Sequence, residues 1–231
     1  MTATHPTRRG DGFAAADSPD TLGGAVRAFF RYPSPLILAA ALLAALAYRL
    51  HLGALGAGDA LAVTAPWLVW PLLEWTLHRY VLHLRPFTLL GLRVDLDFAR
   101  KHRAHHREPW IPELIFLPPY LHLVAIPTLA ALAFALLPTP GPAASVLTGL
   151  FSVALLYEWT HYIVHTRIQP RSRMARRIFR NHRMHHFRNE NYWYSFTVPP
   201  IDRALGTGPD HGSVPRSETC RTLGVDDADH P

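Results

Sequence analysis

The chain carries histidines in four short clusters, and their spacing is the first feature that indicates chemistry. Of its 15 histidines, ten fall in the stretches HRYVLH, HRAHH, HYIVH and HRMHH. Neutral imidazole is a good ligand for zinc, iron, copper and nickel, and ten such nitrogens exceed what one ion accepts, so we expect two ions with about five histidines each. Without metal, the packed rings would bury nitrogens that lack partners. The ten predicted ligands are His78, His83, His102, His105, His106, His161, His165, His182, His185 and His186.

Helical geometry tests whether the histidines of each cluster can face one point. At about 100° per residue, HRAHH and HRMHH each place three imidazoles within an arc of about 100°, and HYIVH places two rings about 40° apart. The first stretch differs, because the spacing of His78 and His83 separates their rings by about 140° on a regular helix. We therefore expect His78 on a helix face and His83 at a frayed helix end or a bulge, consistent with Pro86 just downstream.

Two carboxylates precede histidines on predicted helices. Glu74 lies one turn before His78, and Glu158 lies shortly before His161, so each acid shares a helix face with a histidine. An acid inside an apolar span is costly unless it is paired or functional. We expect Glu74 and Glu158 to accept the free ring N–H of a histidine ligand, which would fix its tautomer. Direct ligation of the metal by either acid is the alternative.

Other polar residues near the clusters are less distinctive. Four of them are further candidates to support the ligands, although helix-cap and turn roles explain them equally well: Asn181, Glu190, Asn191 and Asp202. The remaining histidines lie in polar ends, at the other end of a span, or alone. We expect no metal ligand among His5, His51, His122, His211 and His230.

Four apolar stretches predict the helices that hold these clusters at a membrane. Each is close to the roughly 20 residues that a helix needs to cross the hydrocarbon layer. Two prolines in the second stretch, Pro66 and Pro71, are tolerated where neighbouring helices satisfy the backbone. Long core helices of a soluble bundle are the alternative, but length and aromatic flanks favour the membrane. The predicted spans are Leu36–Leu52, Ala60–Leu82, Tyr120–Leu137 and Ala143–Val164.

Positive charge is distributed unevenly among the connecting segments. Arginines crowd residues 85–107 and 167–188, whereas the loops GALGAGD and PTPGPA carry no positive charge. By the positive-inside rule, both termini and all four histidine clusters are expected on the cytoplasmic side. The net charge of +6 does not indicate nucleic-acid binding, because the arginines adjoin spans and no nucleic-acid motif accompanies them. Anionic lipid head groups explain them better.

The two ends of the chain are polar. Cys220 is the single cysteine, which excludes a disulfide framework and a thiolate metal site. Residues 1–20 lack the apolar core of a signal peptide. Residues 208–231 are predicted to be a disordered tail. Within residues 1–35, the stretch TLGGAVRAFFRYPSP predicts a short interfacial amphipathic helix, with a disordered lead-in as the alternative. The apolar side of that helix would carry Leu22, Val26, Phe29 and Phe30.

The motifs together resemble those of a known family. The runs EWTLHRYVLH, KHRAHHREPWIPELIFLPP, EWTHYIVH and NHRMHHFRNENYWYSFTVPPIDRALGT are similar to the fatty acid hydroxylase superfamily, also called the sterol desaturase family. The pattern HX4H, HX2HH, HX3H, HX2HH is that of its fatty acid 2-hydroxylases, and all ten histidine positions match. The resemblance covers about Glu74 to Thr207.

This resemblance implies a fold and a cofactor. The expected fold is all-α: an integral membrane protein whose four transmembrane helices, within a domain at residues 36–207, carry a cytosolic helical cap over a histidine-bound dinuclear centre. Family members use two iron ions, O2 and external electrons to oxidise lipids, and the ten clustered histidines are the implied iron ligands. The segment PWIPELIFLPPY corresponds to a stretch near the family's lipid entry.

The resemblance also implies partners. The expected substrate is a membrane lipid, hydroxylated on a fatty acyl chain or a related group. Residues 1–35 are too short and too polar for the cytochrome b5 domain fused to full-length eukaryotic members, so we expect a separate cytochrome b5-like or ferredoxin-like electron donor.

Several related reactions remain open at this stage. A lipid desaturase would use the same metals, and a carotenoid or sterol oxygenase would differ only in its pocket. A non-catalytic protein in which zinc joins cap and membrane bundle is a further alternative. Zinc can also occupy an iron site in a purified sample, because affinity order does not identify the working metal.

Overall fold

The computed structural model describes Ala14, Ala15 and residues 17–225, and the chain divides into two compact units. His5, His230, residues 1–13 and 16 of the expected polar N-terminal segment, and the last residues of the expected tail lie outside the described residues. The first unit comprises Met1–Val26, Leu72–Ile115 and Thr160–Pro231, and the second comprises Arg27–Pro71 and Phe116–Trp159. All ten clustered histidines belong to the first unit.

Four long apolar helices confirm the predicted membrane-spanning architecture. They are long and apolar enough to cross a membrane: Pro33–His51, Ala57–Leu82, Pro112–Leu136 and Pro140–Val164. Pro66 and Pro71 lie inside the second of these helices, as expected. The corresponding elements are α2 (Pro33–His51), α3 (Ala57–Thr76), α6 (Pro119–Leu136) and α7 (Pro140–Val164).

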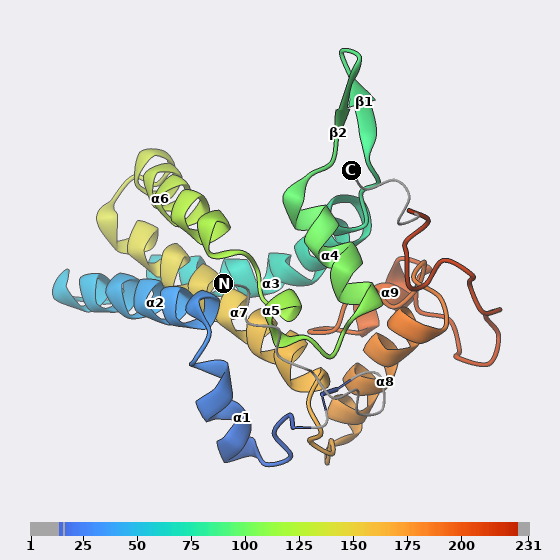
Figure 1. Ribbon diagram of the computed structural model, residues 1–231. Coiled ribbons are helices and arrows are strands. Elements are labelled where there is room, and N and C mark those ends of the chain that lie inside the picture. The colour runs from blue at the N-terminus through green and yellow to red at the C-terminus, as the bar shows by residue number, and fades with distance from the viewer. Residues whose placement is uncertain (1–13, 16, 226–231) are drawn as a thin grey trace, which may run out of the picture. The chain divides into compact units, whose positions relative to one another are not determined.

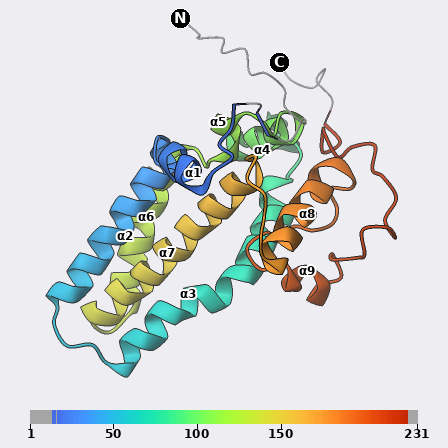
Figure 2. The same ribbon diagram turned by 90° about the horizontal axis from the view of Figure 1, so that it is seen from below.

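The second unit packs these helices closely. Helices α2, α6 and α7 lie side by side (Figures 1 and 2). The buried guanidinium of Arg49 on α2 pairs with Asp59 on α3 at 2.6 Å, and Ser145 on α7 donates to the same carboxylate. Gly149 on α7 meets the backbone of α3 so closely that a Cβ there would lie 2.2 Å from the carbonyl oxygen of Val63. Three spans are therefore tied together by one ion pair and one glycine contact.

The expected amphipathic helix before the first span is present as α1 (Leu22–Phe29). Leu22, Val26 and Phe30 are exposed, as an interfacial helix requires. Phe29 is buried instead, and its ring packs against Phe116 and Trp159. Phe29 is thus a core residue of the second unit.

The first unit is built from short elements around the ends of α3 and α7. A π-helix, η1 (Leu77–Leu82), continues α3 directly. After it come α4 (Asp97–Arg107), α5 (Pro112–Ile115), α8 (Arg173–Phe187) and α9 (Pro200–Ala204), and α8 begins at a serine cap, Ser172, whose side chain accepts the N–H of Ala175. The all-helical prediction missed one antiparallel hairpin in this unit, formed by β1 (Phe87–Leu89) and β2 (Leu92–Val94).

The segment after α9 also belongs to the first unit. Composition predicted a disordered tail from residue 208, but the described residues 209–225 make specific contacts. Val214, Cys220 and Leu223 are buried. Arg188 donates to the carbonyl of Val214, and Arg85 donates to that of Leu223. Polar composition misled here because this segment is fixed mainly through its backbone, which composition does not report.

Candidate metal centre

The π-helix η1 explains the five-residue spacing of the first motif. The N–H of His83 bonds to the carbonyl of His78 at 3.3 Å, a bond from residue i+5 back to residue i. This wider turn brings His83 over His78, and their ring centroids lie 5.0 Å apart. The structure combines the two expected origins for His83, because a π-turn supplies the bulge and His83 is itself the residue that ends this helix.

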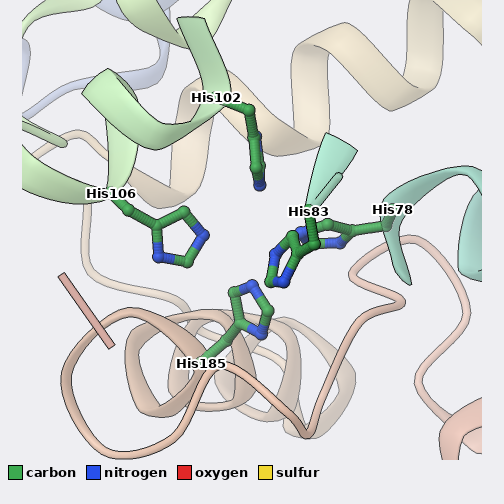
Figure 3. A group of neighbouring side chains, drawn as sticks. All are labelled: His78, His83, His102, His106 and His185. Carbon is green, nitrogen blue, oxygen red and sulfur yellow. The ribbon is translucent and has the colours of Figure 1, made fainter. Parts of the chain in front are cut away.

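Five histidines form one group. Their ligating nitrogens all lie within 4.8 Å of one another. Figure 3 shows the five rings turned toward a shared centre. They come from η1 and its end, from α4 and from α8, so three separate elements build the group. Its members are His78, His83, His102, His106 and His185.

A second group lies beside the first. Its four members, whose nitrogens meet the same distance limit, are His105, His161, His165 and His182. The Nε2 atoms of His161 and His105 are 3.1 Å apart, and those of His165 and His182 are 2.9 Å apart. His186 falls outside the four by this limit, but its Nε2 lies 3.2 Å from that of His182. The structure thus brings all ten predicted ligands together as five and four, with His186 next to the four.

Backbone carbonyls orient several of the rings. The Nδ1–H of His78 donates to the carbonyl of Tyr194 at 2.5 Å, and that of His185 donates to the carbonyl of Tyr192 at 2.7 Å. His106 donates in the same way to Cys220 at 3.0 Å. A ring that donates through Nδ1 keeps its lone pair on Nε2. The three carbonyls therefore fix the tautomer that directs Nε2 into the first group.

The donor set of the first group fits a metal ion. The Nε2 atoms of all five rings are buried, and none has a hydrogen-bond partner among the described residues. Buried nitrogens without partners are unfavourable, whereas neutral imidazoles that converge on a cation are ordinary ligation. Burial lowers the pKa of His106 to about 3 and holds the pKa values of His83, His102 and His185 well below the ordinary value. These rings are neutral at pH 7, as ligation requires.

Glu74 does not have the partner that its spacing predicted. Its buried carboxylate accepts the backbone N–H of Phe196 at 2.8 Å and of Thr197 at 3.1 Å, and the hydroxyls of Ser195 and Thr197. The expected acceptor role toward His78 is therefore wrong, because the carbonyl of Tyr194 already takes that N–H. Glu74 instead supports His78 indirectly, because it holds the loop that carries this carbonyl.

Asp202 also holds this loop through hydrogen bonds. Its carboxylate accepts the N–H groups of Tyr194 and Ser195, each at 2.9 Å, and the hydroxyl of Thr207 at 2.8 Å. Trp193 has a left-handed backbone, with φ of 57°, between the two residues whose carbonyls receive His78 and His185. Such a conformation is unfavourable for a bulky residue and persists where the surroundings impose it. The loop is therefore held in one geometry by two acids and a buried tryptophan.

Glu158 belongs to a polar cluster in the second unit. Its Oε1 accepts from the hydroxyl of Ser34 at 2.9 Å and from the N–H of Leu117 at 3.1 Å. Ser34 Oγ also lies 2.6 Å from Nε2 of His122, a histidine to which the sequence gave no role. These bonds connect α2, α6 and α7 within the membrane-spanning part. The expected support of a histidine ligand by Glu158 stays a prediction.

The remaining candidates take structural roles. Asn181 accepts the ring N–H of His211 through its Oδ1 at 3.0 Å, and Glu190 accepts the hydroxyl of Thr219 at 2.6 Å. The backbone and side chain of Asn191 both donate to the side chain of Asn189, at 3.0 and 3.1 Å. Sequence reasoning missed the carbonyls of Tyr192, Tyr194 and Cys220, and no side-chain signal could have revealed them.

Comparison with known proteins places this geometry in context. A family model described as fatty acid hydroxylase matches residues 63–207. A dihydroceramide fatty acyl 2-hydroxylase of Arabidopsis thaliana is 30% identical over 142 residues, which are 62% of this chain and 58% of that protein. A ceramide very long chain fatty acid hydroxylase of Saccharomyces cerevisiae is 29% identical over 62% of this chain and 37% of its own length. The chain thus spans less than two thirds of either relative.

The fold also has a solved counterpart. The structure of full-length Scs7p, in which only the hydroxylase domain is visible, superposes with a TM-score of 0.65 and 22% sequence identity. The match covers 80% of this chain and 68% of that one. This likeness confirms the predicted helical fold.

Proposed function

Because the chain belongs to the fatty acid hydroxylase family, we propose that it is a membrane-bound, oxygen-dependent lipid hydroxylase whose ten clustered histidines bind two iron ions. It would insert one oxygen atom into a C–H bond of a fatty acyl chain or a related lipid group. The relatives named as fatty acyl 2-hydroxylases support an acyl chain as the substrate class. Desaturation of the lipid, and oxidation of a sterol or carotenoid, are alternatives that the product would identify.

The observation that carries the proposal is the set of five buried Nε2 atoms without partners among the described residues. They belong to one group of five histidines, next to a second group of four. Among the residues that the structure describes, both groups consist of histidines alone, in contrast to soluble di-iron bundles, where Glu residues supply ligands. Two adjacent groups of imidazoles support a dinuclear centre of the kind expected for this family.

The residues of this chain would hold and shield the centre. The first group and the second group would each bind one iron ion, with His186 as the fifth ligand of the second. Bound iron would supply the activation of O2 and the oxidation of an unactivated C–H bond, which no side chain can perform. The ring of Phe196 stacks on His161 with centroids 4.9 Å apart and lies 5.0 Å from His182, so it shields the second group from water.

The proposed orientation in the membrane rests on the distribution of arginines, and the proposed electron donor rests on the needs of the reaction. The four apolar helices make the chain an integral membrane protein. The arginine-rich segments 85–107 and 167–188 support a cytoplasmic position for the centre. The reaction requires reducing electrons, and a separate cytochrome b5-like or ferredoxin-like protein would supply them.

Lipid analysis of expressing cells tests the proposal. The parent chain and two variants, His185→Ala and His51→Ala, are expressed with a compatible electron donor, with and without added iron. His51 is an exposed histidine outside both groups and serves as the matched control. We expect a lipid that gains one oxygen with the parent and His51→Ala only, and more of it with iron.

The other outcomes are equally informative. A lipid that loses two hydrogens would replace hydroxylation by desaturation. Full product formation by a verified His185→Ala protein would contradict the proposed centre. Tight zinc binding with no oxidised lipid under any donor would favour the non-catalytic alternative.

A further inference from the structure

The hairpin of β1 and β2 ends in an exposed apolar tip. Leu89, Leu90 and Leu92 are 55%, 95% and 71% exposed. Figure 1 shows the hairpin projecting beyond α4, an element of the same unit. Exposed leucines are common singly, but three within four residues at the end of a projecting hairpin form a surface that water disfavours. A tip of this kind requires a partner.

The turn residue itself strengthens this conclusion. Leu90 and Gly91 have φ values of 51° and 79°, which is the geometry of a two-residue hairpin turn. Asn, Asp and Gly suit the first of these positions, whereas a leucine there is sterically unfavourable. An apolar side chain therefore occupies a place where the backbone alone would favour a polar one or glycine. Its contribution must come from what the tip contacts.

The chain connects the hairpin closely to a membrane span. The second span ends at Leu82, and β1 begins at Phe87. Five extended residues reach at most about 18 Å. The base of the hairpin therefore lies no more than about 18 Å from the end of this span, a distance at which it can reach lipid head groups.

Two arginines lie close to the apolar tip, Arg85 just before β1 and Arg93 within β2. Both line a pocket of about 340 Å³, together with Pro86, Phe87, Thr88, Gly224 and Val225. Arg85 is anchored through Nε to the carbonyl of Leu223 at 2.9 Å. Guanidinium groups bind phosphate oxygens well. Arg93 pairs with Thr88, one residue pair from Leu89 and Leu92, so its backbone lies only about 3.3 Å along the strand from these leucines. A long arginine side chain can still reach back from there to the head groups while its apolar stem stays near the leucines.

We propose that the hairpin inserts into the bilayer surface: Leu89, Leu90 and Leu92 enter the acyl region, and Arg85 and Arg93 meet the phosphates of the lipid head groups. This role concerns membrane attachment and is independent of the proposed hydroxylase reaction. It would hold the histidine-bearing unit against the membrane at a point outside the four spans.

Depth measurement with a fluorescent label tests the proposal. Leu90→Cys is labelled with an environment-sensitive dye in the full chain, reconstituted in nanodiscs at one chain per disc. The one native cysteine, Cys220, is buried, and the unmodified chain measures any labelling there. Glu218→Cys, an exposed position in the same unit, is the matched control. Quenching is compared between lipids spin-labelled on the acyl chain and aqueous iodide.

We expect the label at position 90 to be quenched several-fold more by spin-labelled acyl chains than the label at position 218, and to be protected from iodide. Replacing Leu89 and Leu92 with Ser should reduce acyl-chain quenching at position 90. Nanodiscs with phosphatidylglycerol should give deeper insertion than phosphatidylcholine alone, and Arg85→Gln with Arg93→Gln should remove that difference.

Two results would overturn the proposal. Iodide access at position 90 equal to that at position 218 would leave the tip in water. Protection from iodide without acyl-chain quenching would place the tip against protein, such as a second copy of the chain.

Discussion

The carbonyl oxygen of Tyr194 lies 2.5 Å from Nδ1 of His78, so a main-chain atom holds the ring of a histidine in the first group. That carbonyl belongs to a loop whose N–H groups are fixed by Glu74 and Asp202. The two buried acids therefore position the loop, and the carbonyl of Tyr194 in that loop orients the imidazole of His78. Removal of either acid should loosen a ligand that it does not touch.

Glu74→Gln tests whether Glu74 supports His78 through this loop. An amide presents only one acceptor oxygen and turns donors toward the N–H and hydroxyl groups that Glu74 now accepts. Loss of a supporting interaction of this kind typically costs about 10- to 100-fold in metal affinity or activity. We expect metal content at limiting iron to fall by about that range, measured by mass spectrometry of purified protein. Glu113→Gln, at an exposed acid, should leave metal content unchanged.

The π-helix makes a prediction about chain length. Deleting Tyr80, an exposed residue of η1, would reduce the spacing of His78 and the next histidine to four, which places both on one face of a regular helix. This deletion should keep two metal ions per chain. Inserting one alanine after Tyr80 should remove His83 from the group and lower the metal count. Equal metal content in the two proteins would contradict the role assigned to the π-turn.

The segment 209–225 should be required for the first group. Truncation after Gly208 removes the Cys220 carbonyl that holds His106, together with the bond from Arg188 to Val214. We expect the metal count per chain to fall from two toward one, and chelator-induced loss to accelerate. Truncation after Val225 retains every contact named here and should keep both ions. Two tightly bound ions in the shorter protein would show that the segment is dispensable.

Metal removal should destabilise the first unit more than the second. A bound ion stabilises the native state by mass action, and its loss leaves buried imidazoles without partners. We expect a chelator to lower the thermal midpoint of the parent, and to do so much less for His185→Ala. Hydrogen exchange should locate the change at α4 and α8. Uniform loss of protection across α2 and α6 as well would argue against a local effect.

The sequence was sufficient to predict which histidines come together and where the spans lie, because both depend on side-chain type. Nine of the ten histidines singled out by spacing form the two groups, with His186 beside the second, and apolar length identified α2, α3, α6 and α7. The hairpin was missed because the motif-rich stretch around it reads as a connector and its strands have three residues each. Its tip also has a leucine where turn rules favour Asn or Gly.

The supporting contacts were harder to predict for a physical reason. His106 is held by the backbone carbonyl of Cys220. Every residue has such a carbonyl, so the residue type at position 220 does not reveal this contact. Glu74 was recognised as a buried acid, but helical spacing alone could not place the loop at residues 195–197 beside it. Contacts between segments more than 100 residues apart in sequence depend on the tertiary fold.

Incorporation of isotopic oxygen tests most sharply whether the histidine centre transfers oxygen from O2 to a lipid. The purified chain is loaded with iron, supplied with a reducing partner and lipid, and exposed to O2 labelled with oxygen-18, alongside His185→Ala and His51→Ala proteins. We expect a lipid product that carries one labelled oxygen, made by the parent and His51→Ala and absent with His185→Ala. A product whose oxygen comes from water, or one that His185→Ala makes at the parental rate, would contradict it.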